Sequence, residues 1–267
     1  MVGSLGLAAV PKAAVVTGSA RGIGAAIARR LARDGYAVAV TDLEKMGEQA
    51  EGVVKEITAG GGKAIFAPID VSDRDAHLSV VEKTQKAFGG LGVYVNNAGV
   101  APGRQLVNVD PEHLDLLYSV NVRGVLWGMQ AAVKAFREQK TYGRIINASS
   151  IAGVQAFPDL GIYSSTKFAV RSLTQTAARE FAQYGVTVNS YGPGVVPTPM
   201  WTEIDRSLSV EKGTELGSEL KNSLRLSLMD RDETAEDIAG LVSYLASDDA
   251  AYMTGSLVVI DGGIVFH

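Results

Sequence analysis

The 267-residue sequence contains no cysteine, so disulfide bonds and thiolate-bound metal sites are excluded. Histidine is also scarce, with three residues in the chain. His77 and His113 fall in stretches with helical periodicity, His267 is terminal, and none has the H-x-x-x-H spacing by which a helix binds zinc. We therefore expect no catalytic metal ion.

The sequence also lacks a cluster of basic residues. Its 25 Lys and Arg and its 29 Asp and Glu are interspersed and leave a formal net charge of −4. Nucleic acids and anionic membrane surfaces attract basic patches, so we expect neither as a partner.

Residues 1–10 have little of what a targeting segment needs. They are mildly apolar, but they lack the basic stretch of a signal peptide and are too short to span a bilayer. We interpret them as a loose N-terminal extension. Together with the absence of cysteine, this favours a cytoplasmic protein.

Short runs typical of buried strands alternate along the chain with stretches of helical periodicity. Strands are predicted at 13–17, 37–41, 64–68, 93–96, 144–148, 186–191 and 257–260. Helices are predicted at 22–34, 43–59, 73–88 with Ser72 as the N-cap, 111–138, 163–184 and 234–246. Parallel strands joined by helices form a sheet that is covered on both faces. The sequence therefore predicts a doubly wound α/β Rossmann fold with about seven parallel strands.

No internal repeat, low-complexity tract or flexible linker divides the chain. We predict a single dinucleotide-binding catalytic domain over residues 1–267. Residues 200–227 are polar, compatible with helix and without a strong apolar stripe. We interpret them as an insertion near the site that covers the substrate.

A glycine-rich turn follows the first predicted strand, with Gly18, Gly22 and Gly24 in the order Gly-x-x-x-Gly-x-Gly. Such a turn at a helix N-terminus lets backbone N–H groups approach a pyrophosphate, although a glycine-rich turn on its own is more often only a turn. Asp42 ends the second predicted strand, near the separation of about 20 residues expected for an acid that binds a ribose 2′-hydroxyl. The two features together predict nucleotide binding.

Tyr163 and Lys167 are spaced so that they share one face of a predicted helix. An ammonium beside a phenol favours the phenolate, so we expect Lys167 to lower the pKa of Tyr163 from its usual value of about 10. Such a pair could exchange a proton with an alcohol oxygen. Taken alone, the same spacing is more often an exposed Tyr and Lys on a helix surface.

Several motifs occur together in one order: the turn from Thr17 to Gly24, Asn96-Asn97-Ala98-Gly99, Asn121, Ser150, the Tyr163/Lys167 pair and Pro193-Gly194. In this order and spacing they resemble the short-chain dehydrogenase/reductase family over nearly the whole chain. Three segments, Tyr163 to Glu180, Pro193 to Asp205 and Tyr252 to His267, resemble its acetoin reductase/butanediol dehydrogenase branch. That branch implies diacetyl, acetoin and 2,3-butanediol as substrates.

The resemblance implies a role for each catalytic residue. Tyr163 would be the general acid in ketone reduction and the base in alcohol oxidation. Ser150 would hydrogen-bond the substrate oxygen, with Ser149 as the close competitor. Lys167 would bind the nicotinamide ribose and lower the pKa of Tyr163. Asn121 would hold a water that links Lys167 to solvent, the alternative being a helix-interior amide that satisfies a neighbouring carbonyl.

The resemblance also implies a nicotinamide cofactor, with transfer of the pro-S hydride. Its pyrophosphate would lie on the turn formed by Gly18, Ser19, Arg21, Gly22, Ile23 and Gly24. Adenine would meet Asp70 and Val71, a pair that is equally compatible with a simple turn before a helix. The ribose and carboxamide contacts would come from Asn97, Ala98, Gly99, Tyr163, Lys167, Pro193, Gly194, Val196 and Thr198. Asp42 should repel a 2′-phosphate and favour NAD, whereas Arg21 resembles a residue of relatives that use NADP.

Ile151 directly follows Ser150, Phe157 lies in the loop leading to Tyr163, and both are apolar, so they should wall the substrate pocket; Trp201 either joins that wall or packs elsewhere. An apolar wall should prefer a methyl group to an oxygen, because a buried hydroxyl without a partner costs about 1–3 kcal/mol. With the resemblance, this favours (S)-acetoin and (S,S)-2,3-butanediol as products.

Three alternatives stay open. A reductase of 3-oxoacyl or larger alicyclic ketones would share the same motifs. A non-catalytic nucleotide-binding module would be expected to lack Tyr163, Lys167 or Ser150, and all three are present. A structural oligomer is the third, since the helices after the fourth and fifth strands resemble those by which relatives form tetramers. That last feature fits a homotetrameric enzyme equally well.

Overall fold

The computed structural model describes residues 6–266; residues 1–5 and 267, and with them half of the predicted extension and His267, lie outside the described residues. All seven strands of the sheet are parallel, in the order β3-β2-β1-β4-β5-β6-β7. They are β1 Ala13–Thr17, β2 Ala37–Thr41, β3 Ala64–Phe66, β4 Val93–Asn96, β5 Gly143–Ala148, β6 Val186–Pro193 and β7 Leu257–Ile260. The predicted doubly wound fold is confirmed.

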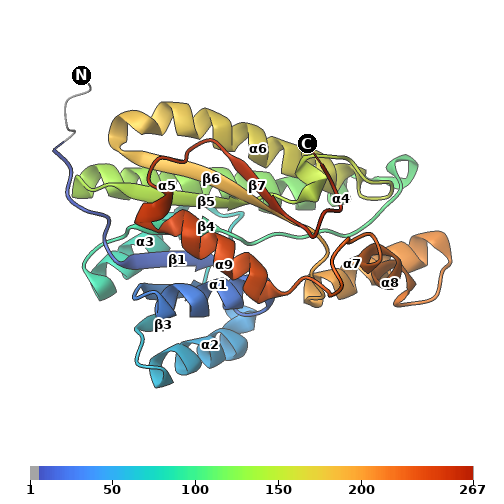
Figure 1. The fold of residues 1–267 in the computed structure, drawn as a ribbon, viewed down its shortest axis with the longest axis horizontal. Helices are drawn as coiled ribbons and strands as arrows, with labels where there is room; N and C mark the ends of the chain where they lie inside the picture. Colours follow the sequence, from blue (N-terminus) through green and yellow to red (C-terminus); the bar gives the residue numbers. More distant parts are fainter. Residues whose placement is uncertain (1–5, 267) are drawn as a thin grey trace.

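Helices cover both faces of the sheet (Figure 1). The α-helices are α1 Gly22–Arg33, α2 Gly47–Ala59, α3 Arg74–Phe88, α4 Pro111–Tyr118, α5 Gly124–Gln139, α6 Gly161–Phe181, α7 Pro199–Lys212, α8 Ser218–Leu224 and α9 Ala235–Ala246. Apolar residues of α1, α2 and α9 form the core on one face, and those of α3, α5 and α6 form the core on the other. The strands between them are buried on both sides, as expected for a parallel sheet.

The strand order reverses on either side of β1, since β2 and β3 lie to one side of it and β4 to β7 to the other. In an open parallel sheet, ligands bind in the crevice at the carboxyl ends of the strands where the order reverses. The turn after β1 and the segment after β4 meet at this crevice. The topology therefore brings together most of the motifs identified in the sequence.

Several helical boundaries differ from those expected; α2 begins at Gly47 and α6 at Gly161. Asp73, rather than Ser72, caps α3, because its carboxylate accepts the N–H of Asp75. The predicted helix 111–138 is divided into α4 and α5 by a π-helical turn, Ser119–Arg123. Such turns insert an extra residue into a helix and are frequent at functional sites.

The prediction that the N-terminal extension is loose is wrong for its described residues, 6–10. Ala8 forms a parallel bridge with Thr141, donating its N–H to Lys140 at 3.0 Å and accepting that of Tyr142 at 3.1 Å. The extension is thereby attached to the start of β5. Composition could not predict this contact because it joins backbone groups distant in sequence.

Residues 200–227 contain α7 and α8, which project beyond the sheet (Figure 1). Although the segment has no long apolar stripe, Ile204 and Leu208 of α7 are buried against Ala101, in the loop after β4. The helix thus contacts the carboxyl side of the sheet through a small separate cluster.

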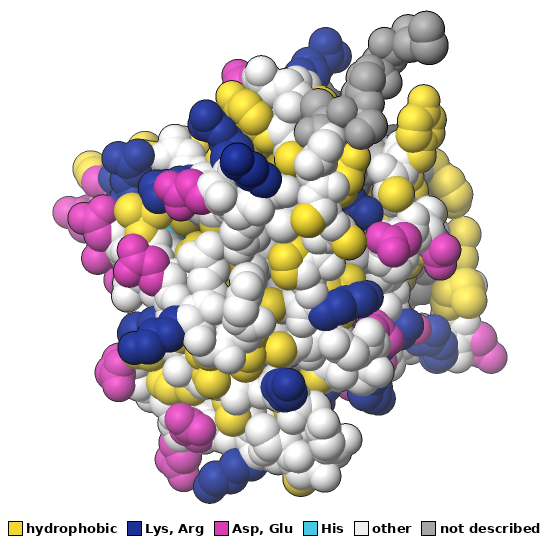
Figure 2. Space-filling model, turned by 90° about the vertical axis from the view of Figure 1, so that its left-hand side faces the viewer, with side chains coloured by type: hydrophobic (Ala, Val, Ile, Leu, Met, Phe, Trp, Pro, Cys, Tyr) yellow, Lys and Arg dark blue, Asp and Glu magenta, His cyan; other side chains and the backbone are white. Residues whose placement is uncertain are grey.

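Charges of both signs are interspersed on the face shown in Figure 2, in keeping with the even distribution along the sequence. Within residues 6–266, no helix combines the length and the apolar character that a membrane span requires.

Helix α5 packs closely on β4 because Gly128 has no side chain. A Cβ there would lie 2.9 Å from the Asn96 amide carbon and 3.0 Å from the ring of Tyr94. We predict that Gly128→Ala lowers the free energy of unfolding by about 1–3 kcal/mol through overpacking. Gly52→Ala is the matched control, since a Cβ at that position of α2 meets nothing within 4 Å; it should raise stability by up to about 1 kcal/mol. Urea unfolding of both variants measures the contrast, and equal effects would contradict this packing argument.

Candidate active site

Tyr163 and Lys167 lie one turn apart near the start of α6. The Lys167 ammonium is 5.5 Å from the centre of the Tyr163 ring and donates a hydrogen bond of 2.9 Å to the carbonyl of Ala148, the last residue of β5. Lys167 is buried and Tyr163 is half-buried. The helix therefore presents the pair to the carboxyl end of the sheet, where a ligand would bind.

Ser150 follows β5 and caps a short 3₁₀ helix, its hydroxyl accepting the N–H of Ala152 at 3.1 Å. The same hydroxyl forms a hydrogen bond with the Tyr163 phenol. Ser149, the competing residue, instead donates its hydroxyl to the Lys167 carbonyl at 3.2 Å. Of the two serines, Ser150 is the one that meets the phenol.

The expected lowering of the Tyr163 pKa by Lys167 is wrong for this structure. Burial raises the pKa of Tyr163 to about 12, partly opposed by the hydrogen bond with Ser150. Burial also lowers the pKa of Lys167 to about 8. Removal from water disfavours the charged form of each group, and the Lys167 ammonium is directed to a carbonyl rather than to the phenol oxygen. At neutral pH the site holds a protonated phenol.

Asn121 lies in the π-helical turn and is buried. Its amide oxygen accepts the N–H of Val100 at 2.9 Å, and its amide nitrogen donates to the Val100 carbonyl at 2.8 Å and to the Thr166 hydroxyl at 3.2 Å. The side chain thus fastens the loop after β4 to α6, beside Lys167. This is the contact with a neighbouring carbonyl that the alternative interpretation expects.

The glycine-rich turn is shaped by close approach. Gly18 and Gly22 have φ angles of +64° and +57°, which favour glycine. A Cβ on Gly18 would lie 2.8 Å from the Cα of Ala98, and one on Gly24 would lie 2.6 Å from the Asn97 amide nitrogen. The turn after β1 is therefore pressed directly against the segment after β4.

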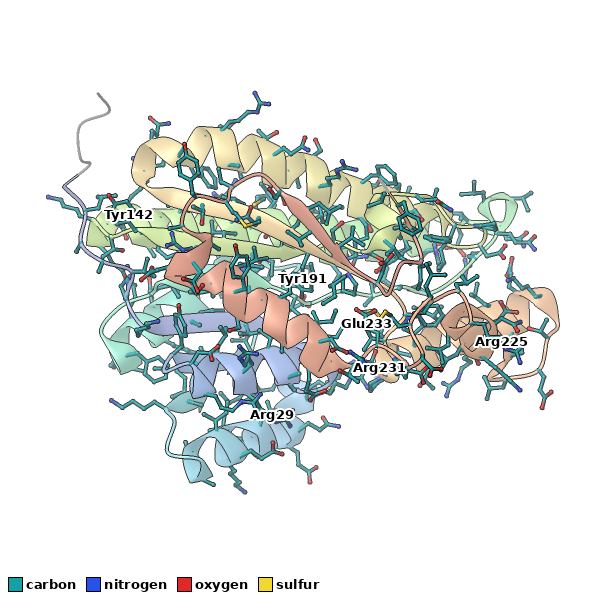
Figure 3. All side chains as sticks on the ribbon, in the orientation of Figure 1. Arg29, Tyr142, Tyr191, Arg225, Arg231 and Glu233 are labelled. Carbon is teal, nitrogen blue, oxygen red and sulfur yellow. The ribbon has the colours of Figure 1, made fainter. Side chains whose placement is uncertain are left out.

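That segment is held by hydrogen bonds with β1, with β6 and with the glycine-rich turn. The Thr17 hydroxyl accepts the N–H groups of Asn97 and Ala98, both at 3.0 Å. The Asn97 amide donates to the carbonyls of Thr17 and Gly18 at 2.8 and 3.1 Å and accepts the Tyr191 hydroxyl at 2.9 Å. Tyr191, labelled in Figure 3, comes from β6 and was not among the predicted site residues.

The start of α1 is open to an anion. No side chain among the described residues caps it, and its first turn, with Ile23, contains no acidic residue. A cavity of about 550 Å³ lies beside it, lined by Arg21 of the turn, Thr198 before α7, and Glu203 and Arg206 of α7, among others. Arg21 is paired with Glu203 at 3.1 Å. Free helix N–H groups and two guanidinium groups fit a bound pyrophosphate.

Ser19 departs from its predicted place. Its N–H donates to the Thr41 carbonyl at 3.0 Å, and its hydroxyl donates to Val16 at 2.7 Å and accepts the Thr41 N–H at 2.9 Å. The residue is fully buried. Its polar groups link β1 to β2 instead of lining the phosphate site, because the backbone groups at the ends of both strands lie within its reach.

Asp42 directly follows β2, and Asp70 lies in the loop after β3. The half-buried Asp42 carboxylate accepts the N–H groups of Ala20 at 3.1 Å and Leu43 at 2.9 Å, which joins it to the glycine-rich turn. Asp70 is exposed and accepts the N–H and hydroxyl of Ser72 at 2.9 and 2.7 Å. Asp70 therefore forms the turn that the bare sequence also allowed.

Val71 is fixed by a residue that the sequence did not single out. Its carbonyl lies 2.9 Å from one ring nitrogen of His77, whose other ring nitrogen lies 2.8 Å from the Tyr94 hydroxyl. His77 is fully buried, and burial lowers its pKa. A helical histidine carries no sequence signal for such a role, because both partners come from other elements.

The segment from Pro193 to Thr198 connects β6 to α7. Gly194 donates its N–H to the Ile260 carbonyl and to the Glu233 carboxylate, both at 3.0 Å. Val196 is buried in the core under α1 and α9, and Thr198 immediately precedes α7. The segment thus lies between the sheet edge and the start of α7.

An apolar cluster contains Tyr163 itself. Its other members are Trp201 and Met200 at the start of α7, Leu160 before α6, and Ala101, Ile204 and Leu208. Ile151 is buried and Phe157 half-buried, and both lie outside this cluster. Trp201 and Tyr163 thus pack against the same buried residues, of which Ala101 and Leu208 were not among the predicted site residues.

Comparison with known proteins decides the family. Residues 18–265 match the family model described as enoyl-(acyl carrier protein) reductase. The chain is 46% identical to L-2,3-butanediol dehydrogenase of Corynebacterium glutamicum, and the match covers 96% of this chain and 99% of that protein. It is 42% identical to a diacetyl reductase, (S)-acetoin forming, of Staphylococcus epidermidis, and the match covers 96% of this chain and 99% of that protein.

The chain belongs to the short-chain dehydrogenase/reductase family. It is an oxidoreductase of this family, whose members bind a nicotinamide cofactor. Among solved structures, a dehydrogenase/reductase from Sinorhizobium meliloti is similar, with a TM-score of 0.84 and 33% identity over 96% of this chain and 95% of that one. A short-chain dehydrogenase from Burkholderia cenocepacia in complex with NADP is also similar, with a TM-score of 0.83 and 32% identity over 96% of this chain and 98% of that one.

The burial of the Lys167 ammonium should make the free energy of unfolding of this oxidoreductase depend on pH. Lys167 has a pKa of about 8 in the folded protein against 10.5 ordinarily, so between these values the unfolded chain binds the proton and the folded chain does not. Stability due to this group therefore rises with pH through that window and is lowest below it.

We predict that wild type gains stability relative to Lys167→Met between about pH 8 and about pH 10, by more than about 1 kcal/mol, since a tenfold change in proton affinity corresponds to about 1.4 kcal/mol. Lys86→Met, at an exposed position of α3, should show no such gain. Urea unfolding at several pH values measures both differences. Parallel pH profiles for the two variants would contradict the prediction.

Proposed function

We propose that this protein is an NAD-dependent oxidoreductase that interconverts diacetyl, (S)-acetoin and 2,3-butanediol. The observation that carries the proposal is the Tyr163 phenol, which is hydrogen-bonded to Ser150 and packed in an apolar cluster at the carboxyl ends of the strands. The names of the Corynebacterium and Staphylococcus relatives support the substrate class.

Tyr163 transfers the proton. With a pKa near 12 it is protonated at neutral pH, so it is ready to donate to the oxygen of a ketone as that oxygen gains charge. In the reverse direction it accepts the proton of the alcohol. A bound nicotinamide supplies or accepts the hydride, and that chemistry belongs to the cofactor.

The neighbours of Tyr163 orient the substrate and the proton. Ser150, already hydrogen-bonded to the phenol, directs its hydroxyl to the substrate oxygen and stabilises charge there. Lys167 holds the nicotinamide ribose hydroxyls. Asn121 would hold a water beside Lys167 through the second lone pair of its amide oxygen, since its amide nitrogen donates to Val100 and Thr166.

The cofactor would be held along the crevice where the strand order reverses. Gly18, Arg21, Gly22, Ile23 and Gly24 surround the pyrophosphate, whereas Ser19 contributes by fixing the turn. Val71 and Asp70 meet adenine, and Asn97, Ala98 and Gly99 line the ribose. Pro193, Gly194, Val196 and Thr198 hold the carboxamide.

The apolar cluster around Tyr163 selects small substrates with methyl groups. Ile151 and Phe157, which lie outside this cluster, offer no hydrogen bond to a second oxygen, and Trp201 offers only its indole N–H. A buried, unpartnered oxygen costs about 1–3 kcal/mol, enough for roughly tenfold to hundredfold discrimination. This selection, with the printed name of the Staphylococcus relative, supports (S) products.

The remaining features of the proposal concern organisation. The chain acts as one catalytic domain, in which residues 200–227 form the lid over the substrate. Ion pairs of Lys212 with Asp159 and Glu219, at 3.2 and 2.8 Å, support the lid role because they fasten α7 to the loop before α6 and to α8. We propose a cytoplasmic homotetramer.

Chiral analysis of the product tests the proposed function. With NADH, diacetyl should give mostly (S)-acetoin, and (S)-acetoin should give (S,S)-2,3-butanediol. Tyr163→Phe should lower turnover by about 10²–10⁴-fold, the usual worth of a general acid. Mostly (R)-acetoin would refute the handedness. Turnover of 3-oxoacyl or bulky alicyclic ketones with none of diacetyl would refute the substrate class.

Cofactor choice is tested at Asp42. Its carboxylate should repel a 2′-phosphate in any pose, whereas Arg21 is already paired with Glu203. We predict that Asp42→Asn and Asp42→Ser raise the ratio of NADPH to NADH activity about tenfold or more, because a pair of like charges near a protein surface is worth about 1–4 kcal/mol. Glu44→Gln, at an exposed position nearby, is the control. A wild-type preference for NADPH would contradict the assignment of NAD.

A further inference from the structure

Glu233 is a partly buried acidic residue that has no role in the mechanism proposed above. It lies between α8 and α9, directly before Thr234, whose hydroxyl caps α9 (Figure 3). One carboxylate oxygen accepts the N–H of Gly194 at 3.0 Å. The other is buried and has no hydrogen-bond partner among residues 6–266. This oxygen is expected to destabilise the fold, because a buried polar atom without a partner is destabilising.

The contact with Gly194 is tight. The Gly194 N–H also donates to the Ile260 carbonyl at 3.0 Å, at the end of β7. A Cβ on Gly194 would lie 2.8 Å from the Asp261 Cβ and 2.9 Å from the bonded Glu233 oxygen. The start of the segment 193–198 is therefore enclosed between the end of β7 and the Glu233 carboxylate.

The charged groups around Glu233 do not neutralise it. Asp261, after β7, is a second acid, and its carboxylate accepts the N–H groups of Gly263 and Val265. Arg231 is committed to Asp237 of α9 through two hydrogen bonds of 2.7 and 2.8 Å. Burial, and to a smaller extent the charges of Asp261 and Asp237, raise the pKa of Glu233 to about 7, against the Gly194 N–H and Arg231, which lower it.

This carboxylate therefore destabilises the fold once it is charged. Its pKa is about 7 in the folded protein against 4.5 ordinarily, so the folded chain binds the proton more tightly and stability falls as pH rises through that window. The α9 capping box is formed by Thr234 and Asp237 and does not use Glu233. What Glu233 does contribute is a charged acceptor for Gly194.

We propose that Glu233 is a positioning residue for the nicotinamide end of the cofactor. Its carboxylate holds the Gly194 N–H and so fixes the segment 193–198, whose Val196 and Thr198 hold the carboxamide. This inference rests on the proposed function. A hydrogen bond to a charged acceptor is about twice as strong as one to a neutral acceptor, so the hold strengthens as Glu233 loses its proton.

The test compares the binding of NADH with that of ADP-ribose, which lacks the nicotinamide. Glu233→Ala should weaken NADH binding about tenfold, the worth of a hydrogen bond to a charged group, and leave ADP-ribose binding unchanged. Glu233→Gln keeps an acceptor oxygen and should lie between wild type and Glu233→Ala. Glu236→Ala, at an exposed position in the first turn of α9, should change neither affinity.

A pH series separates positioning from a purely structural role. In wild type, the ratio of NADH to ADP-ribose affinity should rise as pH passes through about 7, whereas in Glu233→Gln it should stay constant. If Glu233→Ala fails to fold, the Gln variant and its pH series decide the matter.

The outcomes are distinguishable. If wild type binds neither NADH nor NADPH, the proposed function fails and this inference fails with it. If wild type binds NADH, but Glu233→Ala binds it equally well or loses NADH and ADP-ribose in the same proportion, the inference alone is overturned. A wild-type affinity ratio that is constant with pH, equal to that of Glu233→Gln, also overturns it.

Discussion

The close approach of the glycine-rich turn to the segment after β4 is the constraint on which the site depends. A side chain on Gly18 would collide with Ala98, and the Asn97 amide occupies the space beside Gly24. Asn97 also receives the Tyr191 hydroxyl, so one amide joins the ends of β1, β4 and β6. The network is buried or half-buried, and a missing partner would leave a polar group unsatisfied. The crevice is therefore rigid before any ligand enters it.

Burial acts in opposite directions on the two titrating residues at the centre of this crevice. It raises the pKa of Tyr163 and lowers that of Lys167, because each is favoured in its neutral form. The spacing of the pair in the sequence suggests a phenol made acidic by its neighbour, but Lys167 is bonded to the Ala148 carbonyl instead. The protein thus holds the phenol as a proton donor, the form that ketone reduction requires.

Much of the fold could be predicted from the sequence because it depends on local periodicity: the strands at 13–17, 37–41, 93–96 and 257–260 have the bounds that the structure gives them. The motif residues could be named because glycine, Tyr and Lys occupy recognisable spacings. What could not be predicted is set by contacts between distant segments. Ser19 links β1 to β2, His77 contacts the Tyr94 hydroxyl, and Glu233 reaches Gly194 from a segment about 40 residues away. None of these contacts has a local signature.

Helix α7, the proposed lid, is attached differently from the rest of the site. Gly103 donates its N–H to the Ser207 hydroxyl at 2.8 Å, and Glu211 accepts from Asn108 at 2.6 Å, so α7 is joined to the loop after β4 by side chains near the surface. Such exposed polar contacts contribute little to stability individually, whereas the proton-transfer residues are fixed by the sheet and α6. Exposed residues of α7 can therefore change at small cost to the fold, unlike Ile204 and Leu208, which are buried against Ala101. The geometry of proton transfer and the choice of substrate are thus separable within one chain, which is how one fold serves many substrates.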